Sequence, residues 1–171
     1  SLPMKILFLF LITISAMAGD CFEQAKKYGS RFDALLSPSC LQQAEKLAGP
    51  DQKKTSDVNE TEQWMSIGYA NILIARKLKP IDEVRDNVIA GSFSQLENIV
   101  ATAIDADHHE IYTLDSANNT ISVFNVTLPG NVSPKRSFNS DDLTGAIAIS
   151  VESSVLTVQF PDKVRKYDRV D

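Results

Sequence analysis

The sequence predicts an α+β chain in which a helical N-terminal segment is followed by antiparallel strands. Apolar residues recur every three or four positions up to Pro80, and they alternate with polar residues beyond Val88. The alternating part also repeats itself after about 45 residues. At 43% hydrophobic and 23% charged, the 171 residues have the composition of a globular protein with a packed core.

The first residues have the features of an export signal. Met4-Lys5 precede an apolar run from Ile6 to Ile14, and Ser15-Ala-Met-Ala18 follows as a small-residue cleavage site. The run is shorter than the roughly 20 residues that span a bilayer. We therefore expect residues 1–18 to be a cleavable signal peptide with a short N-terminal extension, and the protein to be secreted or periplasmic.

Export affects the interpretation of the two cysteines, Cys21 and Cys40. In an oxidising compartment they are expected to pair, and closing a loop of this size contributes about 3 kcal/mol through chain entropy. Asp20 stands directly before Cys21, where lipid attachment needs a small residue. The sequence thus favours a structural disulfide over a lipoprotein anchor.

A helical region is predicted over residues 19–80. Apolar residues between Phe22 and Phe32 have helical spacing. A second helix is expected from Pro38, a residue suited to the first turn, to Leu47, with Gly49-Pro50 as its stop.

The longest helix is expected over residues 58–78. Asp57-Val-Asn-Glu60 has the spacing of a capping box at its start. On a helix, Trp64, Ile67, Ile74 and Leu78 would share one face. We expect that face to pack on the sheet formed by the following strands.

Eight short strands are predicted after this region, from the period-two alternation, β-branched residues and turn residues. They are Val88–Ala90, Ala101–Asp105, Ile111–Leu114, Ile121–Val126, Lys135–Asn139, Ala146–Ser150, Val155–Phe160 and Val164–Tyr167.

Two sets of these strands match each other. Ala101–Asp105 lies over Ala146–Ser150, Ile111–Leu114 over Val155–Val158, and Ile121–Asn125 over Val164–Asp168. The offsets decrease from about 45 to about 43 residues, with gaps at the turns. A unit of four short strands in about 45 residues has the size of a β-propeller blade.

The first copy also resembles a known family. Glu110-Ile-Tyr112, the run from Leu114 to Asn125 with its Asp-Ser-Ala-Asn-Asn turn, and Gly130-Asn-Val-Ser-Pro-Lys-Arg136 are similar to blades of NHL-like β-propellers. The resemblance covers residues 85–171 as two four-stranded repeats, and the second repeat departs from the pattern at Gln159–Asp162. It implies a scaffold that presents loops to a ligand or protein, with enzymes in only some branches of the family.

Two repeats are too few for a propeller, which has four to eight blades. With a helix expected at residues 57–84, that region supplies no further blade. Three arrangements are open: part of a longer or split reading frame, a homo-oligomer of chains that closes a ring, or a two-unit sheet covered by the N-terminal helices.

No catalytic set is recognisable. Asp105, Asp107, His108, His109 and Glu110 are the densest group of potential metal ligands. This stretch lacks the glycine and the downstream glutamate of an EF-hand, and adjacent histidines on a strand point to opposite faces. We expect a solvated hairpin turn with no metal and no cofactor. Since these are the two histidines of the chain, no separate Ser-His-Asp arrangement is available.

The sequence therefore predicts an exported, non-enzymatic binding or interaction module. A net charge of −5 without a basic stripe argues against nucleic acid, and leaves a protein or small molecule as partner. Alternatives are a fragment or oligomerising part of a propeller-type hydrolase or lyase, or an adaptor whose helices carry the function. The expected binding residues lie on two turns of a rigid scaffold: Asp105, Asp107, His108, His109 and Glu110 on one, and Asp115, Ser116, Asn118 and Asn119 on the other.

Overall fold

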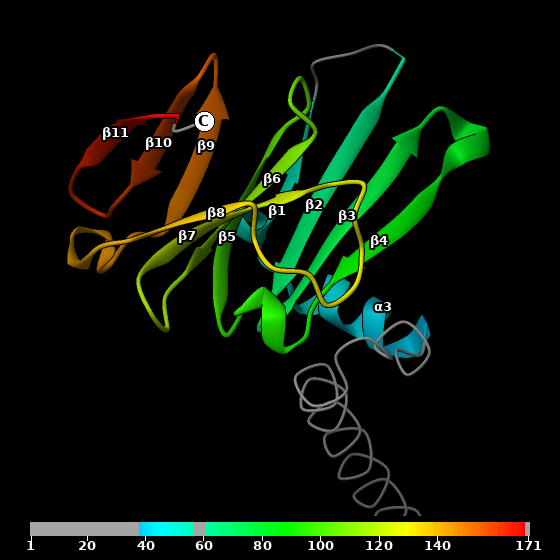
Figure 1. The fold of residues 1–171 in the computed structure, drawn as a ribbon, viewed down its shortest axis with the longest axis horizontal. Helices are drawn as coiled ribbons and strands as arrows, with labels where there is room; N and C mark the ends of the chain where they lie inside the picture. Colours follow the sequence, from blue (N-terminus) through cyan, green and yellow to red (C-terminus); the bar gives the residue numbers. More distant parts are fainter. Residues whose placement is uncertain (1–37, 57–60, 170–171) are drawn as a thin grey trace, which may run out of the picture.

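The computed structural model describes residues 38–56 and 61–169, and it contains three antiparallel sheets (Figure 1). One α-helix, α3 (Pro38–Leu47), precedes them in this part of the chain. The first sheet contains β1 (Lys53–Thr55), β2 (Gln63–Tyr69), β3 (Ile72–Lys79) and β4 (Arg85–Ile89). The second contains β5 (Ile99–Asp105), β6 (Glu110–Asp115), β7 (Thr120–Asn125) and β8 (Arg136–Asn139), and the third β9 (Ala148–Glu152), β10 (Val155–Gln159) and β11 (Val164–Asp168).

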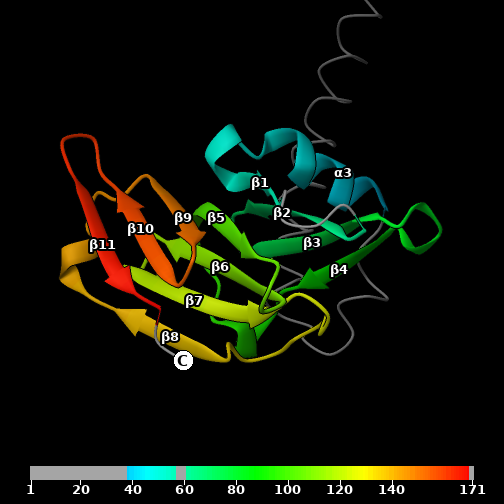
Figure 2. The same cartoon turned by 90° about the horizontal axis from the view of Figure 1, so that it is seen from above.

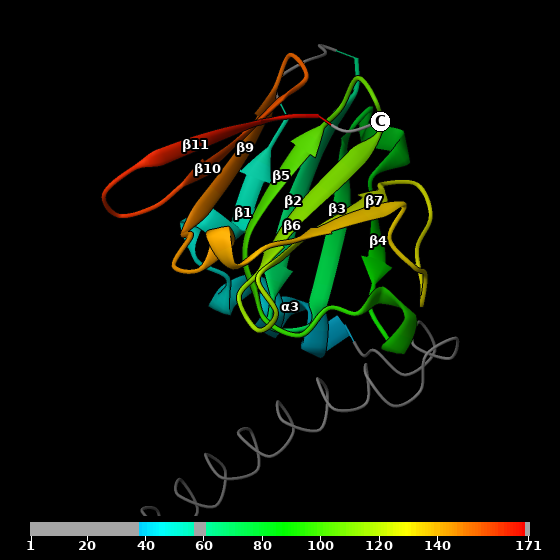
Figure 3. The same cartoon turned by 60° about the vertical axis from the view of Figure 1, so that its left-hand side comes forward.

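The strands of each sheet follow one another in chain order, and the sheets pack face to face. The strand β5 contacts both β1 and β9, so the first strands of the three sheets lie next to one another (Figure 3). We call the contact between the first and second sheets the first interface, and that between the second and third sheets the second interface. This arrangement is compatible with blade-like repeats that do not close into a ring within the described residues.

The helix α3 covers the face of the first sheet that points away from the second sheet (Figure 2). Its bounds confirm the helix predicted from Pro38 and the Gly49-Pro50 stop. Cys40 on the helix and Ala48 just after it pack against Ile67, Ile74 and Val88. The first sheet is thus buried on both faces.

The helix expected over residues 58–78 is not formed. Residues 63–69 and 72–79 are instead the strands β2 and β3, joined by a tight turn at Ala70-Asn71. Trp64 faces the second sheet and Ile67 faces α3, so they do not share a face. The helix prediction was wrong because β3 is buried on both sides. Its continuous apolar run Ile72–Ala75 shows no alternation, and periodicity alone does not distinguish such a run from a buried helix.

This correction changes the number of units. The segment 57–84, expected to supply no blade, contributes two central strands of a four-stranded sheet. The eight strands predicted from Val88 onward are all present, as β4 to β11, with small differences at their ends. The described chain therefore holds two four-stranded sheets and a third with three strands.

The structure also shifts the alignment of the repeats by one residue at their second predicted match. Ile111 is buried in the first interface and Leu156 in the second, so these two face the preceding sheet in the same way. Val155, which the sequence match placed over Ile111, lies on the opposite face of β10. The turns absorb the difference: four residues separate the paired Asp105 and Glu110, but two separate Glu152 and Val155.

Several predictions fall outside the described residues. These are the signal peptide, the helix between Phe22 and Phe32, and the Asp57–Glu60 capping box. Cys40 is buried in α3, but Cys21 lies outside the described part, so the disulfide stays a prediction. Within residues 38–56 and 61–169, no helix is long and apolar enough to cross a membrane.

Candidate binding groove

An apolar groove with a volume of about 390 Å³ opens at the second interface. Strands β6, β7 and β8 form one wall, and β10 and β11 form the other. Phe138 on β8 and Tyr167 on β11 face each other with ring centroids 5.6 Å apart, and Phe138 is 43% exposed. The walls are lined by Tyr112, Ile121, Val123, Arg136, Ser137, Phe138, Leu156, Tyr167, Asp168 and Arg169.

The groove lies along the edge of the third sheet at which, among the described residues, no fourth strand is present. In the first and second sheets, β4 and β8 occupy that position. The apolar residues nearer the first strands, such as Ala103, Leu114 and Val158, are fully packed. The opening is therefore confined to the outer part of the interface.

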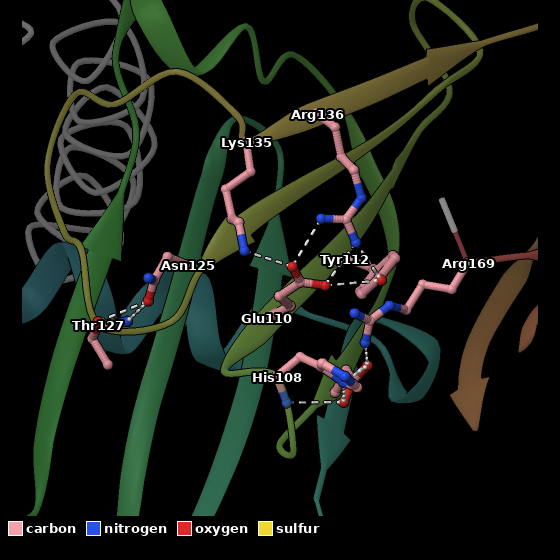
Figure 4. Close-up of polar contacts among 9 residues, drawn as sticks. His108, Glu110, Tyr112, Asn125, Thr127, Lys135, Arg136 and Arg169 are labelled. Carbon is pink, nitrogen blue, oxygen red and sulfur yellow. Dashed lines mark hydrogen bonds and ion pairs between the residues drawn. The ribbon is translucent and has the colours of Figure 1, made fainter. Parts of the chain in front are cut away.

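A buried carboxylate organises one end of the groove (Figure 4). Glu110 begins β6, and both of its oxygens accept hydrogen bonds from the guanidinium of Arg136, at 2.8 and 2.7 Å. The ammonium of Lys135 donates to Oε1 at 2.6 Å, and the hydroxyl of Tyr112 donates to Oε2 at 3.1 Å. A bidentate guanidinium pair of this kind fixes the position of both partners.

These contacts determine the protonation states at the groove. The hydrogen bonds from Arg136, reinforced by Lys135, lower the pKa of Glu110 to about 2 against the opposing effect of burial. Burial, and then the charge of Glu110, raise the pKa of Tyr112 to about 12. At neutral pH, Glu110 is therefore ionised and Tyr112 is a neutral phenol, which makes neither group a proton-transfer catalyst under those conditions.

A second ion pair closes the same end. The guanidinium of Arg169, which follows β11, donates to Asp105 Oδ2 at 2.8 Å, and its side chain is 8% exposed. His108 Nδ1 lies 2.9 Å from both oxygens of Asp105. Arg169 joins the end of the third sheet to the last residue of β5.

The two histidines lie in the hairpin turn expected between β5 and β6, and they contact different partners. His108 contacts Asp105, whereas His109 Nε2 lies 3.6 Å from Glu62 Oε1. His109, Glu62, Asp107 and Ala106 line a small polar pocket of about 180 Å³. Within residues 38–56 and 61–169, no three His, Cys, Asp or Glu side chains are placed to hold a metal ion.

The second predicted binding turn is largely part of the framework. Asp115 is buried and accepts hydrogen bonds from the backbone N–H groups of Glu97, Asn98 and Ala117, at 2.8 to 3.2 Å. Ser116 Oγ accepts a bond from the Asn98 side chain at 2.7 Å. Asp115 thereby fixes the segment that leads into β5.

The remaining members of that turn bind neighbouring segments. The carbonyl of Asn118 accepts a bond from Thr120 Oγ1, and the side-chain amide of Asn119 donates to Thr144 Oγ1 at 3.0 Å. The turns 106–109 and 116–119 follow successive strands of an antiparallel sheet, so they lie at opposite ends of it. The nine predicted residues thus do not form one binding surface.

Figure 4 also shows the turn that follows Asn125, the residue paired with Glu110 across β6 and β7. Asn125, the last residue of β7, accepts bonds through Oδ1 from the Thr127 N–H and hydroxyl, at 2.9 and 2.7 Å. This turn fixes the start of the long connection that leads to Lys135.

Sequence reasoning missed the residues that line the groove, including Phe138, Tyr167, Arg136 and Arg169. They come from strands far apart in the chain, and their proximity depends on how the two sheets pack. The sequence shows the basic pair Lys135-Arg136 at the start of β8, but no local pattern indicates that it contacts Glu110 on β6.

No protein-family model matches this sequence, and no curated protein matches it either. The groove must therefore be interpreted from its own chemistry.

Proposed function

We propose that the protein is an exported, non-enzymatic binding module built on β-propeller-like repeats of the NHL-like kind, and that its ligand site is the groove between β8 and β11. Residues 1–18 support export, because they have the order of a signal peptide. The three successive sheets support the propeller-like repeat.

The observation that carries the proposed binding role is the open apolar groove. Its volume of about 390 Å³ lies in the range of small-ligand pockets. Both arginines at its rim are neutralised by carboxylates, Arg136 by Glu110 and Arg169 by Asp105. The groove therefore favours a neutral, apolar group over an anion.

The proposal is tested with N-phenyl-1-naphthylamine, a neutral apolar dye whose fluorescence rises on burial. We expect saturable binding to the mature protein. Phe138→Ala removes half of the aromatic pair at the mouth of the groove, and we expect at least a fivefold loss of dye affinity.

Phe93→Ala is the matched control. Phe93 is 63% exposed in the short 3₁₀ turn η4 (Ser92–Ser94) and does not line the groove. It should leave dye affinity unchanged. Absence of saturable binding, or equal affinity for the Phe138→Ala and unmodified proteins, would contradict the proposal.

A further inference from the structure

Arg136 presents a hydrogen-bond donor on the wall of the groove. Its Nη1 and Nη2 atoms donate to Glu110, and Nη2 also donates to the Tyr112 hydroxyl at 2.9 Å. In the described part of the chain, no atom accepts a hydrogen bond from its Nε–H group. Arg136 and Tyr112 both line the groove, and the Arg136 side chain is 23% exposed (Figure 4). The Nε–H group therefore depends on water or on a ligand for its acceptor.

A ligand that fills the groove has to replace that water. Covering an N–H group without giving it an acceptor weakens binding by roughly tenfold or more. Arg136 and Phe138 are two residues apart on β8, so they lie on the same face of the strand, about 7 Å apart along it. A fitting ligand thus has an apolar body against Phe138 and Tyr167, and an oxygen about one ring width away at Arg136.

The filled lone pairs of Glu110 indicate which kind of oxygen fits. Its carboxylate accepts four hydrogen bonds, which occupy the lone pairs of both oxygens, from Arg136, Lys135 and Tyr112. A ligand hydroxyl would find no further acceptor at that carboxylate for its own hydrogen. A ligand carboxylate would meet a guanidinium already neutralised by Glu110, with Asp168 on the opposite wall. A neutral carbonyl oxygen satisfies the Nε–H donor and needs no acceptor in return.

We propose that the groove binds a small apolar molecule with a neutral carbonyl group, such as a ketone, ester or amide, and that Arg136 Nε–H donates to its oxygen. This names the ligand class of the groove and so rests on the proposed function. Phe138 and Tyr167 hold the apolar body, and the bidentate pair with Glu110 keeps the guanidinium in position. Arg136 is then the residue that selects carbonyl compounds over hydrocarbons of the same shape.

Three naphthalenes of matched size test the carbonyl group: 2-acetylnaphthalene, 2-isopropylnaphthalene and 1-(2-naphthyl)ethanol. Each displaces N-phenyl-1-naphthylamine from the mature protein, and the displacement gives its affinity. We expect the ketone to bind at least as tightly as the isopropyl compound, although transfer from water alone favours the hydrocarbon. We also expect it to bind at least fivefold more tightly than the alcohol. A ketone weaker than the hydrocarbon, or no tighter than the alcohol, would overturn the proposal.

Arg136→Lys tests the donor. Lysine keeps a cation beside Glu110 but lacks the Nε–H group of arginine. We expect the ratio of ketone to hydrocarbon affinity to fall at least fivefold. A general loss of packing would lower both affinities and leave this ratio unchanged, because the two compounds have the same shape.

Lys135→Met is the matched control. Lys135 donates to the same carboxylate at 2.6 Å but does not line the groove, so the ratio should be kept. An unchanged ratio in Arg136→Lys, or an equal fall in Lys135→Met, would overturn the proposal.

The carbonyl stretching band of the bound ketone reports the hydrogen bond without any change to the protein. The infrared difference between ¹²C- and ¹³C-carbonyl ketone isolates this band from the protein amide bands. We expect it at lower wavenumber than in hexane, because a hydrogen bond weakens the C=O bond. A band at the hexane position would overturn the carbonyl contact while dye binding, and with it the proposed function, stands. Failure of the dye itself to bind would overturn both.

Discussion

The two interfaces between the sheets use the same kind of strand arrangement but are completed to different extents. In the first, Trp64, Ile89 and Phe124 are buried together, and the edge of β4 bonds to Gly130, with Gly130 N 2.7 Å from the Val88 carbonyl. In the second, the outer part is the open groove. Burial at the outer end of an interface thus depends on a segment that covers the last strand.

Alanine substitutions at Phe124 and Tyr167 are expected to differ most in their effect on stability. Both residues lie on the third strand of a sheet and face the preceding sheet. Phe124 is fully buried, so Phe124→Ala is expected to lower the free energy of unfolding by about 3–5 kcal/mol. Tyr167→Ala, beside the groove, should cost about 1–2 kcal/mol. Urea unfolding followed by the emission of Trp64 measures both. Equal losses would show that the groove is as well packed as the first interface.

Glu110→Gln should have the next largest effect. It leaves Arg136 and Lys135 without their countercharge, and the expected loss is about 2–4 kcal/mol in the same unfolding experiment. Glu152→Gln, at an exposed position on β9, serves as the control and should change stability by less than about 0.5 kcal/mol. A loss confined to the control level would mean that the Glu110 cluster does not stabilise the second interface.

Acid should weaken the second interface through the same carboxylate. The pKa of Glu110 is lowered from 4.5 to about 2 in the folded protein, so its contribution is complete above pH 4.5 and is lost as the pH falls toward 2. The difference in unfolding free energy between the unmodified protein and Glu110→Gln is expected to shrink by about 2–3 kcal/mol over this range. If the difference in unfolding free energy did not change with pH, the lowered pKa of Glu110 would be contradicted.

The smallest effect is expected at the surface pair of Asp142 and Arg165. Their side chains are 64% and 37% exposed, so Asp142→Asn should change the free energy of unfolding by less than about 0.5 kcal/mol. A loss above about 1 kcal/mol would indicate that this pair, and not the buried Glu110 cluster, holds the third sheet in place.

Local signals predicted much of the fold. Proline at a first turn and Gly49-Pro50 at the end located α3, and alternation located β4 to β11. The strands β2 and β3 were missed because the first sheet is covered on both sides, which removes the alternation that identifies a strand. No local pattern reports that a helix and a second sheet will cover the same strand.

The candidate site was predicted less well. Asp and Asn residues at turns suggested binding loops, but Asp115 and Glu110 use their carboxylates to bond the protein's own backbone and arginines. Acidic residues at strand ends can bind a ligand or form internal hydrogen bonds, and the sequence alone does not distinguish these two roles. The groove arises from a contact between sheets, for which neither sheet carries a local signature.

The helix α3 also gives the stack of sheets a direction. It occupies the apolar face on which a preceding sheet would pack, whereas the opposite end of the stack presents polar side chains such as Ser150, Glu152 and Gln159. Copies of the chain could join through these two faces only after α3 moved and exposed Ile67 and Ile74. The two ends are therefore unlike: one is closed by the helix α3 packed on an apolar face, and the other by its own polar surface.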